Sequence, residues 1–320
     1  MQNIIEIDGR PRIWLCLAGI VHPGSKKGRI VVNAGLRKWV GWLSLLAGLA
    51  ALAAWILVFE IITLPHGKPI RITFEPGEPS ARGELNLVFG NADYALQACC
   101  EGSTFLVRDP KRGGSVVRGF RTRPTDQHVK GNFRSELRLR PNAVGETVWY
   151  RASVLVPRDW KPSAGPVIAM QWHGSKDFFL GEPGKYPPLD ISIRGDRWHI
   201  TKSWDHRILT TKTPTGNVEG MAELGQVPLI RGRWVTWTVR VHWSSTAAGS
   251  TEIWLDGRKI VDDHGPNAHR DLIGPYLKAG SYVPGWGYSG AEPTISERTL
   301  FFDDIAVDYG PDPFRIGYRE

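Results

Sequence analysis

Apolar and polar side chains alternate along short tracts from residue 147 onward, and this period of two is that of a β-strand. The tracts are rich in Val, Ile, Thr and aromatic residues, with Gly, Pro and Asp between them. Asp256-Gly257 suits a two-residue hairpin, because both residues tolerate positive φ. No helical period is sustained after residue 84. The pattern therefore predicts that residues 85–320 form one all-β sandwich of two sheets. The expected strands are residues 147–156, 165–173, 189–195, 197–204, 234–243, 251–257, 258–261 and 300–307.

A different pattern occupies residues 39–64, an almost unbroken apolar run interrupted by Glu60. A run of this length predicts a helix that crosses a bilayer. Seven cations precede it, against Glu6 and Asp8, and this bias predicts a cytoplasmic N-terminus and an exported remainder. A cleaved signal peptide is an alternative, because Ala51-Leu52-Ala53 resembles a cleavage site. A buried helix is the other alternative.

These patterns divide the chain into four predicted segments. Residues 1–38 form a basic cytoplasmic segment, and residues 39–64 form a transmembrane helix or signal anchor. Residues 65–84, rich in Pro and Gly, form a linker. Residues 85–320 form the sandwich domain, which we expect to be membrane-anchored and outside the cytoplasm, in the periplasm or beyond the cell.

Three tracts place polar residues two apart: NFRSELRLR (132–140), MQWHG (170–174) and YLKAGSY (276–282). Alternate residues of a strand share a face, so apolar neighbours such as Leu137, Trp172 and Leu277 would turn inward. Gly280 would leave room beside Lys278 for a bulky ligand. A groove for a polyanion is the resulting expectation, lined by Arg134, Glu136, Arg138, Gln171, His173, Lys278 and Tyr282.

Composition and charge agree with this interpretation. The chain has 42% hydrophobic residues and 14 Trp, enough for a full core. Of the net charge of +8, residues 1–64 carry +4, because they hold seven cations and three acids. The remaining +4 suits an acidic ligand. Nucleic acid is not an expected partner, because the cations do not form runs.

The cysteines predict neither a metal site nor an ordinary disulfide. Cys16 lies before the apolar run, and Cys99 and Cys100 are adjacent in sequence. Adjacent cysteines do not form an ordinary disulfide with each other without strain. No spacing of metal ligands is apparent, and we expect no cofactor.

The three tracts, with the segments at residues 145–160 and 250–261, resemble the heparin lyase I-like and glucuronan lyase-like polysaccharide lyases. Alginate lyases of jelly-roll fold carry nearly the same three signatures. The resemblance covers residues 85–309 and implies a jelly roll of two antiparallel sheets that cleaves beside a uronic acid by β-elimination. The chain departs from alginate lyases at Trp172, where they usually have a small aliphatic residue, and at Val283-Pro284, where they have Asn-Gln.

The elimination needs defined roles from the tract residues. The substrate carboxylate must be neutralised, and Arg134 and Gln171 are the candidate donors. His173 is the candidate base and Tyr282 the candidate acid. Lys278 would favour ionised Tyr282 or bind the carboxylate. The resemblance implies His173, Lys278 and Tyr282 most firmly. The substrate-binding candidates are Glu136, Arg138 and, on the strand at 234–243, Arg240 and His242.

The sequence is also compatible with two other functions. A non-catalytic carbohydrate-binding jelly roll would keep the groove without the chemistry. A glycoside hydrolase would need two carboxylates flanking the scissile bond, and no strand offers a Glu-x-Asp-x-x-Glu tract. The tract residues could also be structural, as a surface ion network, a packed histidine or an anchoring tyrosine.

Overall fold

The computed structural model describes residues 34–63, 68–76, 81–82, 92–109, 111, 113–177, 181–210, 218–271, 273–289 and 294–315. The chain divides into two compact units, Met1–Trp55 and Ile56–Glu320. Residues 1–33 of the expected basic segment (1–38) and parts of the expected linker lie outside the described residues.

The expected N-terminal helix is present as α1 (Ala34–Thr63), which is 30 residues long. Leu, Ala and Trp side chains dominate its sequence, and straight-chain and small apolar residues favour a helix. None of the helices in the described part of the chain combines the length and apolar character required of a bilayer-crossing segment. The membrane span therefore stays a prediction.

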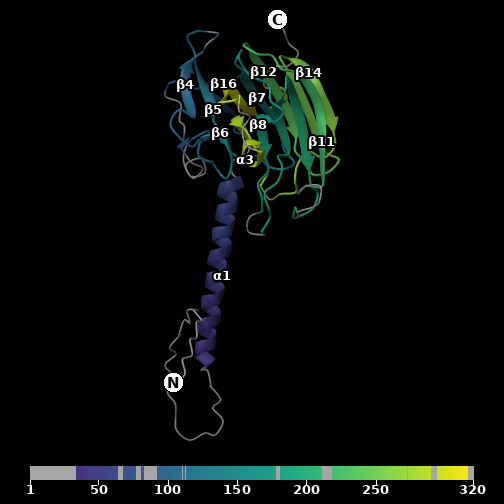
Figure 1. Cartoon of the computed structure of the whole chain (residues 1–320). Helices are drawn as coiled ribbons and strands as arrows, with labels where there is room; N and C mark the ends of the chain where they lie inside the picture. Colours follow the sequence, from purple (N-terminus) through teal and green to yellow (C-terminus); the bar gives the residue numbers. More distant parts are fainter. Residues whose placement is uncertain are drawn as a thin grey trace, which may run out of the picture. The chain divides into compact units, whose positions relative to one another are not determined.

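The second unit is a sandwich of two eight-stranded sheets (Figure 1). Sheet A has the order β14-β13-β12-β7-β16-β5-β4, with β1 paired to β16. Its strands are β1 (Ile70–Ile72), β4 (Thr104–Arg108), β5 (Val116–Thr122), β7 (Thr147–Leu155), β12 (Trp234–His242), β13 (Ser250–Leu255), β14 (Arg258–His264) and β16 (Arg298–Asp308).

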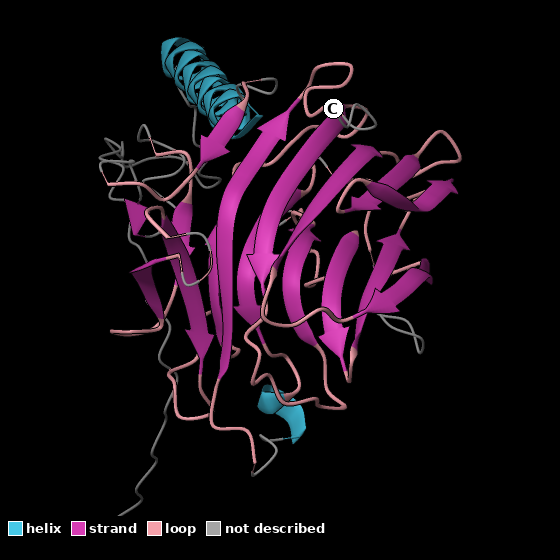
Figure 2. Cartoon of the chain, turned by 90° about the horizontal axis from the view of Figure 1, so that it is seen from above, coloured by secondary structure: helices cyan, strands magenta, loops and turns pink. Residues whose placement is uncertain are grey.

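Sheet B has the order β11-β10-β9-β8-β15-β6-β3-β2. Its strands are β2 (Ala81–Arg82), β3 (Ala95–Gln97), β6 (Arg134–Arg138), β8 (Val167–His173), β9 (Leu189–Arg194), β10 (Arg197–Trp204), β11 (Gly220–Pro228) and β15 (Tyr276–Tyr282). The described strand pairs are antiparallel apart from β2 and β3. Figure 2 shows the strands side by side, with the short helix α3 (Trp286–Ser289) at one end.

The core lies between the sheets, where aliphatic side chains pack around pairs of large aromatic rings. Trp172 of sheet B meets Tyr150 of sheet A edge to face, with ring centroids 5.2 Å apart. Trp198 meets Trp237 in the same way at 5.4 Å. All four side chains belong to one buried cluster. Such edge-to-face pairs add about 0.5–1.5 kcal/mol each to the gain from burial.

The strands predicted from the alternation of apolar and polar residues are present in the structure. All eight tracts form strands, as β7, β8, β9, β10, β12, β13, β14 and β16. Asp256 and Gly257 have φ of 50° and 79°, as the expected hairpin turn requires. The sandwich begins earlier than expected, because β1 lies within the supposed linker. Its Ile72 is 1% exposed and joins the core.

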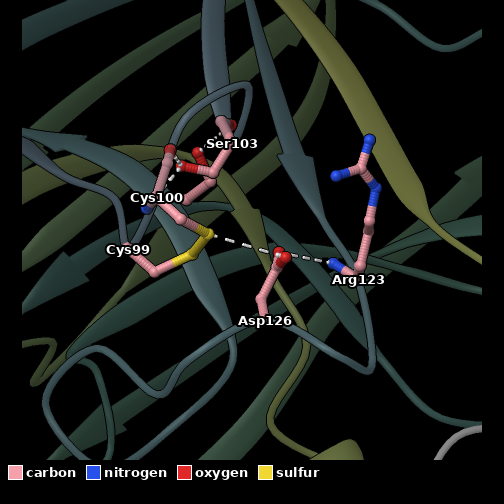
Figure 3. The surroundings of a disulfide bond; sticks show 6 residues. Cys99, Cys100, Ser103, Arg123 and Asp126 are labelled. Carbon is pink, nitrogen blue, oxygen red and sulfur yellow. Dashed lines mark hydrogen bonds between the residues drawn. A yellow bond between two sulfur atoms is a disulfide. The ribbon is translucent and has the colours of Figure 1, made fainter.

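A disulfide joins the adjacent residues Cys99 and Cys100 in the turn between β3 and β4 (Figure 3). Ser103 closes this turn: its Oγ donates to the Cys100 carbonyl at 2.7 Å. Asp126 lies on the other side, with Oδ1 3.7 Å from Cys100 Sγ. The backbone amide of Arg123 donates to the same Asp126 carboxylate at 2.8 Å.

Candidate active site

The three polar tracts lie on neighbouring strands in sheet B. β15 pairs with β6 on one side and with β8 on the other. Register places Lys278 opposite both Arg138 and Gln171, and it places Tyr282 opposite Arg134. Segments more than a hundred residues apart in sequence therefore meet on one sheet.

The polar residues share the face of sheet B that points away from sheet A. Leu137, Trp172 and Leu277 are at most 1% exposed and lie in the core between the sheets. Their strand neighbours Glu136, Gln171 and Lys278 therefore point to the opposite face. The expected assignment of Trp172 to the core and Gln171 to the site face is confirmed.

Glu136 lies at the centre of this face and is only 1% exposed. The Gln171 amide donates to its Oε1 at 2.5 Å, and Arg134 Nη1 lies 3.3 Å from its Oε2. The Lys278 ammonium forms a further ion pair with the same Oε2. Burial raises the pKa of Glu136, but Lys278 and Arg134 outweigh it and hold the pKa below its usual range. Glu136 is therefore a buried counter-ion, which corrects the expectation that it binds substrate.

Lys278 and Gln171 lie in the same buried layer, each 1% exposed. Burial lowers the pKa of Lys278 to about 8, although Glu136 opposes that shift. Because its ammonium already has Glu136 as a partner, Lys278 supports the site from beneath. The expectation that it binds the substrate carboxylate directly does not fit this placement.

A second layer of half-buried side chains covers this cluster. The Arg134 guanidinium lies 4.2 Å from the centre of the Tyr282 ring. Asn132 Nδ2 donates to the Tyr282 hydroxyl oxygen at 3.2 Å, a bond that does not consume the hydroxyl proton. Arg138 covers the Tyr276 ring in the same way, at 4.1 Å. This face of sheet B carries three cations, Arg134, Arg138 and Lys278, against the carboxyl groups of Glu136 and Asp190, so its charge favours an anionic ligand.

His173 lies beside this layer, and its contacts favour one tautomer. Its Nδ1 is 2.7 Å from the Gly174 carbonyl oxygen and 3.2 Å from the Tyr276 hydroxyl oxygen. Because the nearer group, a carbonyl, only accepts, this geometry favours the proton on Nδ1. Nε2 consequently keeps its lone pair and is the nitrogen able to act as a base. The Tyr276 ring stacks on the imidazole, with centroids 5.3 Å apart. Burial, reinforced by the Lys278 charge, lowers the pKa of His173 to about 4.

Gly280 is needed for close packing of the backbone and does not make space for a ligand. Its φ is 152°, and a Cβ there would lie 2.2 Å from the Ser135 carbonyl oxygen and 2.7 Å from Glu136 Cα. The space beside Gly280 is therefore filled by the close approach of β6. This corrects the expectation that Gly280 leaves room for a ligand.

The polysaccharide lyase family matches residues 74–306, which is most of the chain. The chain belongs to this family. None of the curated proteins matches the chain in sequence. It is an enzyme of the lyase class, and its sandwich is the jelly roll that the resemblance implied.

Solved structures of similar fold carry the same kind of name. An endo-β-1,4-glucuronan lyase from the fungus Trichoderma reesei is 17% identical, with a TM-score of 0.54, over 68% of this chain and 94% of that one. An alginate lyase of polysaccharide lyase family 7 is 16% identical, with a TM-score of 0.44, over 64% and 83%. The first likeness supports the fold of this polysaccharide lyase.

Two predicted site residues of this lyase lie elsewhere. Arg240 and His242 are on β12 of sheet A, whose neighbours Val239 and Val241 point into the core. Both polar side chains therefore occupy the outer face of the other sheet. Arg240 pairs with Glu252, and His242 Nδ1 lies 3.0 Å from Thr147 Oγ1. The expectation that they line the substrate groove is wrong.

Three residues of the site face were missed from the sequence. Tyr276 has the same two-residue spacing as Lys278 and Tyr282, and Asp190 alternates with core residues along β9 in the same way. Asp190 lies in register with Gln171, and burial raises its pKa to about 7. Asn132 comes two residues before Arg134, so the alternation also indicated it. Extending the period of two through each tract would have found all three.

No described cluster fits a resident metal as it stands. Cys99, Cys100 and Asp126 have donor atoms within 4.8 Å of one another, but both sulfurs are held in the disulfide. Asp177, Glu182 and Asp271 form a second such group. There the Lys185 ammonium already pairs with Glu182 and Asp271 and fills the place of a cation.

A separate cavity of about 260 Å³ is lined by residues that include Asp93, Arg140, Asn142, Tyr150 and Tyr309. Its polar groups bond to each other: Asn142 Nδ2 donates to the Tyr150 hydroxyl at 2.7 Å, and the Tyr309 hydroxyl donates to Asn142 Oδ1 at 2.7 Å. None of the predicted catalytic residues lines it, so we keep the candidate active site on the outer face of sheet B.

Proposed function

We propose that this polysaccharide lyase cleaves an acidic, uronate-containing polysaccharide by β-elimination. The observation that carries this proposal is that His173 and Tyr282 lie on the same cationic face of sheet B, with His173 Nδ1 2.7 Å from the Gly174 carbonyl oxygen. Elimination requires a base for the proton on the carbon that bears the carboxylate, and an acid for the departing glycosidic oxygen. His173 and Tyr282 supply these two groups, and Tyr282 also acts as base where the stereochemistry of the sugar requires it.

Neutralisation of the substrate carboxylate falls mainly to the outer arginines. The developing dianion needs donors that are already in position, and the guanidinium of Arg134 is held over the Tyr282 ring. Gln171 donates to buried Glu136, so its first task is to hold that carboxylate in place. Arg138 adds a second cation on the same face. Lys278 keeps Glu136 ionised and thereby fixes Arg134.

The substrate class is tested by incubating the full-length chain with a panel of uronate polymers: heparin-like chains, glucuronan and alginate. β-Elimination leaves an unsaturated uronate at the new end, so ultraviolet absorbance should rise with at least one polymer. Hydrolysis would release reducing ends without that absorbance, and it would support a glycoside hydrolase instead. Retention on an immobilised polymer with neither product would support a non-catalytic binding module.

The pH dependence of kcat/KM should reveal His173. A base must be unprotonated in the free enzyme, and the pKa of His173 is lowered to about 4. Activity should therefore persist through neutral pH and fall on the acid side with a midpoint near 4. The measurement is kcat/KM from about pH 3.5 to about pH 8, with recovery after return to neutral pH as the control for unfolding. A midpoint near 6.5, the ordinary value for histidine, would contradict this assignment.

We propose further that the domain is exported and anchored through the N-terminal apolar segment. The support is the apolar run at 39–64 and the seven cations before it. A reporter fused to the C-terminus should be active only outside the cytoplasm, and membrane fractions should retain the full-length chain. Reporter activity in the cytosol would refute export, whereas a shortened soluble form outside the cytoplasm would favour a cleaved signal peptide over an anchor.

A further inference from the structure

A buried ion cluster outside the site face joins two distant loops. The Lys185 side chain is 1% exposed, and its ammonium lies 2.7 Å from Glu182 Oε2. It also pairs with Asp271. Lys185 and Glu182 belong to the segment between β8 and β9, and Asp271 belongs to the segment between β14 and β15. One ammonium therefore holds together two loops that sequence places far apart.

Glu182 extends this cluster to a third loop. Its Oε1 accepts the backbone amide of Thr210 at 2.7 Å, and its Oε2 accepts that of Asp177 at 2.7 Å. Thr210 follows β10, so the segments after β8, β10 and β14 all meet here. Removal of Lys185 would leave two buried carboxylates without their cation, and such groups either take up a proton or move toward water.

Gly174 connects the cluster to the active site. A Cβ on Gly174 would lie 3.0 Å from His269 Nδ1 and 3.3 Å from Asp271 Oδ2, so its backbone packs directly against both side chains. His269 is 1% exposed, and its Nε2 bonds with Ser203 Oγ at 3.0 Å. The Gly174 carbonyl is the group that holds the proton on His173 Nδ1. The position of this one peptide thus depends on the cluster on one side and sets the His173 tautomer on the other.

We propose that Lys185 is a positioning residue for His173: by tying the Glu182 and Asp271 loops together, it holds the Gly174 carbonyl where it fixes the imidazole. The link to catalysis rests on the proposed function, in which His173 is the base. The structural claim stands apart from it, because the tautomer of His173 is measurable without substrate.

The first test is a matched pair of glycine substitutions in the full-length chain. Gly174→Ala introduces a methyl group against His269 and Asp271, whereas a Cβ on Gly184, in the same loop, would meet nothing within 4 Å. Gly174→Ala should lower kcat about tenfold, which is less than the cost of misplacing a reacting group by about 1 Å, because its contacts with His269 and Asp271 are relieved by a smaller shift. KM should change by less than about twofold, because Arg134 and Arg138 are untouched. Gly184→Ala should match the wild type in both.

The second test observes the imidazole itself by nitrogen NMR. In the wild type, His173 should carry its proton on Nδ1 and titrate near 4. Lys185→Met should mix the two tautomers and lower the pKa of His173 further, because the hydrogen bond to the Gly174 carbonyl raises that pKa. Lys185→Arg should restore both the tautomer and the pKa. The titratable groups that face His173 are Lys278, Arg134 and Glu136, His269 and Tyr276, whose hydroxyl lies 3.2 Å from Nδ1. None of these residues is replaced in the variants, although loss of the Lys185 charge raises the pKa of His269, so the His173 tautomer is the readout that reports the loops.

The outcomes separate this inference from the proposed function. A wild-type tautomer and titration in folded Lys185→Met, together with wild-type kcat in Gly174→Ala, would overturn the positioning role. A changed His173 tautomer in Lys185→Met would support the positioning role. If the wild type and all variants also lacked lyase activity, the proposed function would be refuted. If Lys185→Met fails to fold, the His173 tautomer is compared by NMR in Gly174→Ala and Gly184→Ala. The same tautomer in both variants would overturn the positioning role.

Discussion

Replacement of Tyr282 by phenylalanine should lower turnover at least about a hundredfold, the low end of what a positioned proton donor contributes. The phenylalanine ring keeps the packing under Arg134, whereas the hydroxyl, which accepts from Asn132 Nδ2, is removed. Substrate affinity should survive, because the cations that meet the ground-state carboxylate remain. The measurement is kcat and KM on the best polymer of the panel, with the unsaturated product as readout.

Arg240→Ala is the matched control for this prediction. Arg240 is also a polar residue on a strand of the sandwich, but it lies on sheet A, where it pairs with Glu252. Its removal should leave kcat and KM within about twofold of the wild type. Near-normal turnover in Tyr282→Phe together with loss of turnover in Arg240→Ala would show that the active site lies on sheet A and not on sheet B.

Lys278→Met should lower the free energy of unfolding by about 3–5 kcal/mol, the usual cost of breaking a buried ion pair by removing one partner. Glu136 would remain as a carboxylate that is 1% exposed and has lost its ammonium. Denaturant unfolding at neutral pH measures the loss. The same substitution at Lys259, whose side chain is 39% exposed in its pair with Glu252, should cost less than about 1 kcal/mol.

Two further measurements test whether Glu136 is the cause. A double variant with Lys278→Met and Glu136→Gln should recover much of the lost stability but not the activity. The pH dependence has a defined sign. The pKa of Glu136 is held low, so its stabilising charge is present at neutral pH and is lost as pH falls through that depressed value. The gap between the wild type and Lys278→Met should therefore narrow in acid. A gap that is constant with pH would exclude Glu136 as the cause.

The sequence by itself determined the elements and the side on which each residue lies within its own strand. The period of two assigned Trp172 to the core and Gln171 to the opposite face, and both assignments hold. Asp256-Gly257 marked a hairpin, and its backbone angles agree. These features depend on neighbouring residues and on local backbone preferences, so they can be derived along the chain. The three tracts likewise indicated Arg134, His173 and Tyr282 as candidate site residues, and all three lie on strands of sheet B.

Only the tertiary structure decided which sheet each strand joins and how deeply each polar residue lies. Arg240 alternates just as Glu136 does, but β12 pairs within sheet A and β6 within sheet B. Glu136 and Lys278 looked like ligands for substrate until their mutual burial was known, and the Lys185 cluster gave no local pattern at all. Strand pairing and burial arise from contacts between residues far apart in the chain. The period of two along a strand gives the face to which each side chain points. It does not give the residue of another strand or loop that the side chain contacts.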